Sequence, residues 1–139
     1  MENNHDVSAI LKLYELRTED EMRAARQWYS SEFSPKSAMD IIDLYKAGER
    51  ASANFRMVVS YWDMAASLVL NGKIDEKTFL QANTEHIFVF AKIEPFINEV
   101  REMFQEPDFF IHLEKLCKKM PDYEQKLEGR KRLVEFWRR

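Results

Sequence analysis

The chain contains few of the residues that build covalent scaffolds or turn-rich folds. It has one cysteine, Cys117, among 139 residues, so no internal disulfide can form and no zinc-type cysteine spacing exists. Glycine occurs three times and proline four times. Because both residues are common in turns and disrupt helices, their scarcity favours a helical protein over a turn-rich sheet.

No segment of the sequence is apolar enough to cross a membrane. The longest apolar stretch lies between Arg56 and Lys73 and is interrupted by Asp63, whereas a spanning helix needs about 20 apolar residues. Residues 1–6 contain neither a basic region nor an apolar run, so they do not resemble a signal peptide. We therefore expect a cytoplasmic protein with no membrane span.

The formal net charge is only −3, which excludes strong overall attraction to nucleic acid or anionic lipid. Residues 115–139 contain nine Lys and Arg against four Asp and Glu, so they carry +5 and residues 1–114 carry −8. A basic tail of this kind permits weak contact with phosphates. A recognition helix or an aromatic platform is not evident, so no specific nucleic-acid binding is expected.

The composition is that of a buried helical core, with 45% apolar and 13% aromatic residues. Such a chain is too apolar to be disordered, and its length suits one domain. We predict an all-α fold in which residues 1–139 form a single helical domain. The expected architecture is a bundle of five to seven helices around a central apolar helix at about residues 50–70.

The spacing of apolar residues and the positions of helix-capping residues predict the helices of the N-terminal half of the chain. A first helix is predicted to follow Asp6, with Val7, Ile10, Leu11 and Tyr14 at helical spacing. Thr18 followed by Glu21 resembles a capping box that opens a second helix. Ser37 is the next expected N-cap, and we expect near-continuous helix from it through Gly48 to Leu70.

Residues 50–70 are predicted to be central because apolar side chains occupy most of their helical circumference. Asn71–Gly72 predicts a helix end, Asp75 predicts the next N-cap, and Pro95 predicts a kink or restart. The polar remainder of the central helix forms a narrow stripe of four residues, namely Arg56, Ser60, Asp63 and Ser67.

Arg56 and Asp63 of this stripe, together with His86 and Glu94, form the best candidate ligand site. Arginine suits a carboxylate or phosphate ligand, and a histidine can act as a general base. If the stripe faces solvent or pairs with Glu94, its residues have a structural role and bind no ligand. A buried histidine that is hydrogen-bonded to a neighbouring residue is also common. Both interpretations of the four residues remain open at this point.

No metal, cofactor or catalytic residue is predicted. A di-metal bundle needs a Glu-x-x-His motif on each of two helices, and only Glu2 stands three places before one of the three histidines. The Asn71–Asp75 turn lacks the closing glutamate of a calcium loop. Cys117 lies on an apolar helix face, which favours a core position over a reactive one.

Three functional hypotheses follow, and the first does not involve catalysis. The chain has more aromatic residues than one small core needs, and such residues are enriched at interfaces, so we expect a helical interaction or scaffold module that self-associates as a homo-oligomer. The leading surplus residues are Trp28, Phe110 and Trp137. The second is a small-molecule or anion-binding protein, or an enzyme, that uses the cluster around Arg56. The third is weak nucleic-acid binding through the basic C-terminal tail.

Several short segments resemble a bacterial family of small helical proteins of unknown function. They are Asn54–Arg56, Tyr61–Asp63, Asn71–Asp75, Phe79 and Ile93–Pro95, and the resemblance spans roughly residues 10–118. Some members of that family carry an N-terminal membrane anchor, which this sequence does not show. The resemblance implies a helical fold and a bacterial origin, and it implies no activity.

Overall fold

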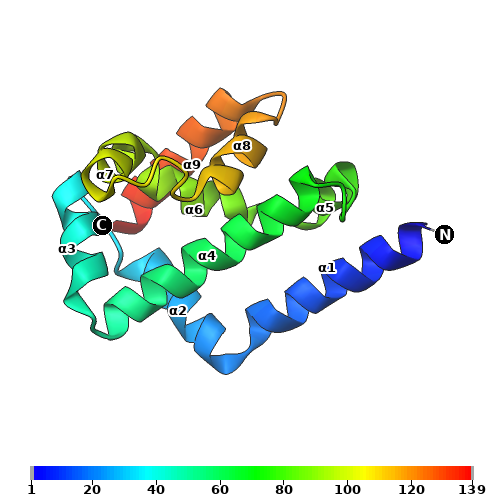
Figure 1. Ribbon diagram of the computed structural model, residues 1–139, viewed down its shortest axis with the longest axis horizontal. Coiled ribbons are helices and arrows are strands. Elements are labelled where there is room, and N and C mark those ends of the chain that lie inside the picture. The colour runs from blue at the N-terminus through cyan, green and yellow to red at the C-terminus, as the bar shows by residue number, and fades with distance from the viewer. Residues whose placement is uncertain (1, 139) are drawn as a thin grey trace.

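The computed structural model is helical along most of the chain, which confirms the predicted all-α class (Figure 1). It describes the backbone of residues 2–138 and the side chains of residues 7–136, and no strand occurs in that part. The chain is divided into shorter helices than expected. In order these are α1 (Glu2–Thr18), α2 (Asp20–Ser31), α3 (Ala38–Ala47), α4 (Arg50–Leu70), α5 (Glu76–Ala82), α6 (Glu85–Ile93), the 3-10 turn η1 (Glu94–Phe96), α7 (Ile97–Phe104), α8 (Ile111–Lys118) and α9 (Tyr123–Arg138).

Three predicted helix boundaries are wrong, two of them because local backbone geometry differs from the sequence pattern. Gly48 adopts a left-handed φ of +69° and ends α3, so the expected continuity from residue 37 to 70 is broken there. Thr18 is the last residue of α1, and its hydroxyl donates to the carbonyl of Glu15 at 3.0 Å instead of capping α2. In addition, α1 begins at Glu2, not after Asp6.

Other predicted boundaries are confirmed. The side chains of Ser37 and Asp75 accept backbone N–H groups at the starts of α3 and α5, at 3.2 and 2.9 Å. Gly72 has a φ of +76° and ends α4, as expected of a left-handed glycine cap. Pro95 converts the helix between α6 and α7 into one 3-10 turn.

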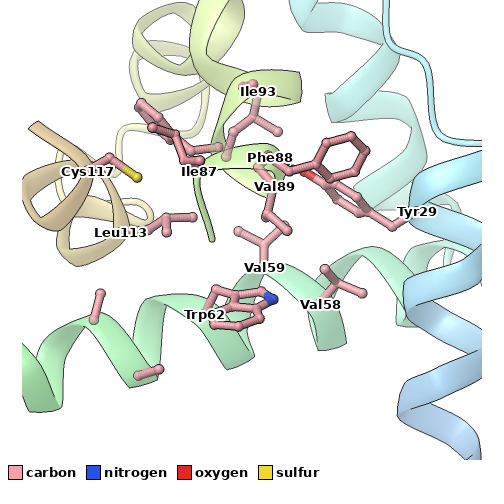
Figure 2. Packing of buried hydrophobic residues seen from close by; sticks show 14 of the residues in the cluster. Tyr29, Val58, Val59, Trp62, Ile87, Phe88, Val89, Ile93, Leu113 and Cys117 are labelled. Atoms are coloured by element: carbon pink, nitrogen blue, oxygen red, sulfur yellow. Dashed lines mark hydrogen bonds between the residues drawn. The ribbon is translucent and has the colours of Figure 1, made fainter. Parts of the chain in front are cut away.

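Helix α4 crosses the middle of the molecule and contacts α2, α3, α5, α6 and α8. Its Phe55 and Trp62 side chains are 0% and 1% exposed. Figure 2 shows Val59 of α4 pointing toward Val89 of α6. The predicted central helix is therefore confirmed. Among the helices within residues 2–138, none has the length and hydropathy that a bilayer crossing requires.

Helix α6 contains a buried lysine that the sequence analysis did not anticipate. Lys92 is 5% exposed, and its ammonium group donates to the backbone carbonyls of Tyr29, Ser30 and Phe33, the last at 2.7 Å. The last carbonyls of a helix have no partner within it. Lys92 thus closes the C-terminal end of α2 and fixes α2 against α6.

Candidate functional site

Asp63, one of the two acidic residues of the predicted ligand set, binds another helix of the same chain. Its carboxylate accepts the backbone N–H of Leu113 at 2.9 Å and lies 3.3 Å from Nδ1 of His112. Phe110, which precedes α8, provides no side-chain cap. Because the first amides of a helix lack partners within it, Asp63 supplies the missing cap of α8 from α4.

Arg56 and Glu94 lie in separate surroundings. The exposed Arg56 guanidinium is 6.0 Å from the centre of the Tyr45 ring of α3, which is a weak cation–π contact. Glu94, in η1, accepts a hydrogen bond of 2.6 Å from Lys131 of α9. Both side chains of that ion pair are 32% exposed, so it contributes modestly to stability. Glu94 is therefore paired with α9 and not with Arg56.

His86 is 1% exposed and lies between two aromatic rings. The ring centres of Trp62 and Phe79 are 6.2 and 5.8 Å away. Within the described residues, neither ring nitrogen has a hydrogen-bond partner. Burial, together with the nearby charges of Arg130 and Lys126, lowers the pKa of His86 to about 4. The imidazole is therefore neutral near pH 7 and shielded from any substrate.

The four residues of the predicted ligand set do not form one cluster. Arg56 faces α3, Asp63 binds α8, Glu94 pairs with α9 and His86 packs between α4 and α5. Among the side chains of residues 7–136, no group of three His, Cys, Asp or Glu could hold a metal ion.

The predicted interface aromatics are partly used within the chain. Trp28 is half-buried, with its ring centre 5.5 Å from that of Phe33. Phe110 is also half-buried, and its ring centre is 4.0 Å from that of Phe109. The side chain of Trp137 lies outside the described residues. The two described rings therefore pack against aromatic neighbours within the same chain.

Cys117 and two residues of the basic tail are placed by contacts within the fold. Cys117 is fully buried, and burial, together with the nearby charge of Glu114, raises the pKa of its thiol to about 12. It is therefore a core thiol and not a nucleophile. In the tail, Lys131 is paired with Glu94 and Arg130 lines a cavity beside α6.

The exposed apolar surface that the sequence analysis missed lies on α1. Val7, Leu11 and Tyr14 are 50%, 58% and 54% exposed, and we call them the α1 stripe. Leu13, on another face of α1, is 6% exposed, and its carbonyl accepts the Tyr61 hydroxyl of α4 at 2.7 Å. Leu11 and Leu13 lie about 160° apart around a helix, so one neighbouring surface cannot bury both. The angular separation of Leu11 and Leu13 around the helix could therefore have indicated from the sequence that one of the two faces is exposed.

Comparison with known proteins identifies a family but no activity. A family model described as a domain of unknown function (DUF4760) matches residues 4–120. This agrees with the resemblance to a family of unknown function. The match covers most of α1 and all of α2 to α8, and it ends before α9. No curated protein and no solved structure matches the chain.

Proposed function

This chain belongs to the DUF4760 family, and we propose that it is a non-enzymatic helical interaction module that pairs with a second copy of itself through α1. The observation that carries the proposal is the α1 stripe, three adjacent apolar side chains that are each at least half exposed. Exposed apolar residues that lie singly need no explanation, but contiguous ones indicate a surface that another molecule covers.

The spacing within the α1 stripe suits helix pairing. Val7, Leu11 and Tyr14 follow one another at intervals of four and three residues. Apolar residues at these intervals line the contact between two helices that pack side by side.

A second copy is the favoured occupant because the stripe is self-complementary. Leu11 lies midway along it, so a two-fold axis beside Leu11 sets Val7 of one copy against Tyr14 of the other. The same antiparallel arrangement opposes the two helix dipoles.

The contact is small, and we expect a transient dimer. Helix α1 has 17 residues, so it is about 25 Å long at 1.5 Å per residue. A standard stable interface buries about 800 Å² per partner, which exceeds what two helices of this length cover. A dissociation constant of roughly 10–100 µM is therefore expected.

Sedimentation equilibrium from about 1 to 500 µM tests the proposal, because this range brackets the expected dissociation constant. Leu11→Gln keeps the helix propensity and removes the centre of the stripe, so dimerisation should weaken at least about tenfold. The matched control is Met103→Gln on α7, where an equally exposed methionine (52%) lies away from α1. It should leave the dimer unchanged.

Two outcomes would overturn the proposal. One is a wild-type chain that stays monomeric over the whole concentration range. The other is equal association of wild type and Leu11→Gln. Thermal melts followed by circular dichroism accompany the measurement, because a surface substitution should change the free energy of unfolding by no more than about 0.5 kcal/mol.

A further inference from the structure

A cavity of about 440 Å³ lies between α9 and the junction of α5 with α6, on a part of the molecule that does not include the α1 stripe. Most of its wall is apolar and comes from Leu80, Ile87, Met120 and Leu133. Its volume falls within the range of about 300–1,000 Å³ that is common for small-molecule sites. None of the four residues predicted as a ligand set lines it.

The charged side of the cavity is basic. Lys126 and Arg130 stand on successive turns of α9, and Asp122 is the one acidic residue of the wall. Asp122 is 3.8 Å from the Lys126 ammonium, which is a loose pair between exposed groups. Arg130 is half-buried and forms no ion pair with any described residue. One guanidinium thus remains available to an anion.

The wall opposite α9 adds further positive potential. It includes Thr84, the N-cap residue of α6, whose side chain makes no capping hydrogen bond. The first amides of α6 therefore lack a side-chain acceptor, and the N-terminal end of a helix dipole attracts negative charge. The field of Arg130 and Lys126 reaches this helix, because both charges lower the pKa of His86 in addition to burial.

Gly129 keeps the space between these walls open. It lies within α9, where a glycine costs about 1 kcal/mol relative to alanine. A Cβ atom at this position would meet only Nη2 of Arg132, at 3.9 Å. Neither backbone strain nor a close neighbour requires glycine there. Its local effect is that no side chain enters the cavity from this turn of α9.

We propose that this cavity binds a small organic anion with an apolar body, of the chemical class of medium-chain carboxylates. The carboxylate lies between Arg130 and the N-terminal end of α6, where both groups stabilise negative charge. The hydrocarbon body packs against Leu80, Ile87 and Met120. The site is independent of self-association through α1, so either proposal can fail without the other.

Isothermal titration calorimetry with octanoate and 1-octanol tests the site on the full chain. Octanoate is expected to bind at least about tenfold more tightly than octanol, because only the carboxylate meets Arg130. Arg130→Gln should remove most of that preference and leave octanol binding unchanged. Arg132→Gln is the matched control, since Arg132 is exposed and does not line this cavity. It should behave as the wild type.

A second pair of variants tests the location. Gly129→Phe places a ring in the cavity and should abolish binding of both probes, whereas Gly129→Ala adds one methyl group and should retain octanoate binding. The proposal is overturned if octanoate gives no binding up to about 5 mM, a concentration that detects even a millimolar dissociation constant. Octanol binding as tight as octanoate, or unchanged binding by Gly129→Phe, would also overturn it.

Discussion

Helices α4 and α1 both carry broad apolar arcs, but neighbouring helices cover them to very different extents. In α4 the side chains of Phe55 and Trp62 are 0% and 1% exposed, whereas Leu11 and Tyr14 of α1 are 58% and 54% exposed. Helix α4 packs against helices on several sides, including α2, α3, α6 and α8. Helix α1 lies at the edge of the molecule, and its N-terminal half stands apart from α5 (Figure 1).

This difference shows that an apolar arc predicts burial only where the fold supplies a neighbour. Full burial of a large apolar side chain stabilises the fold by about 1.5–3 kcal/mol. The α4 side chains make that contribution within one chain. The α1 stripe makes little of it, so its apolar area remains available for a contact between chains. Three substitution experiments test the contrast.

The largest effect is expected at the centre of α4. Trp62→Ala should lower the free energy of unfolding by about 3–5 kcal/mol, because it leaves a large cavity among packed helices. Tyr14→Ala, the aromatic control on α1, should change it by no more than about 0.5 kcal/mol. Guanidinium denaturation measures both values. Similar losses for the two variants would contradict the contrast between α4 and α1.

The next effect is a pH dependence at His86, which packs beside Trp62. Its folded-state pKa of about 4 is below the unfolded value of about 6.5. The unfolded chain therefore binds more protons between these values, and stability falls as pH falls from about 6.5 to 4. The loss from this group amounts to roughly 3 kcal/mol.

His86→Phe should remove that component, and the free energy of unfolding should then vary less between pH 6.5 and 4. His112→Gln is the control, because His112 is half exposed and lies on α8. It should keep the steep dependence. A wild-type protein with flat stability over this range would show that water reaches the centre of the bundle.

The smallest effect compares two leucines of one helix. Leu13 is 6% exposed and Leu11 is 58% exposed. Leu13→Ala should cost about 2 kcal/mol, at the low end for buried leucines, while Leu11→Ala should cost no more than about 0.5 kcal/mol. Urea denaturation at low protein concentration, where dimers are absent, measures both. Equal costs would mean that the two faces of α1 are buried alike.

Local chemistry made much of the fold predictable. Ser37 and Asp75 cap helices as expected because an N-cap bond joins residues only three positions apart. The expected helix through Gly48 is wrong because a glycine permits both a helical and a left-handed backbone. Which one occurs depends on where α3 must turn to meet α4.

The candidate sites were less predictable because their contacts join distant parts of the chain. Asp63 was selected as a ligand group, yet its partner is an amide 50 positions away. Lys92 was not selected at all, and the carbonyls that it binds lie 59 to 63 positions earlier. The cavity beside Gly129 forms only when α9 packs on α6.

The sequence by itself determined the helical class, the central helix at residues 50–70 and several helix ends, because periodicity and capping act over a few residues. Tertiary structure alone decided that Leu13 is buried and Leu11 exposed, that Asp63 caps α8, and that Arg130 faces an apolar cavity. The physical reason is that the burial of a side chain and the choice of its hydrogen-bond or ion-pair partner depend on which helix surfaces pack together. Sequence patterns that span a few residues do not specify that packing.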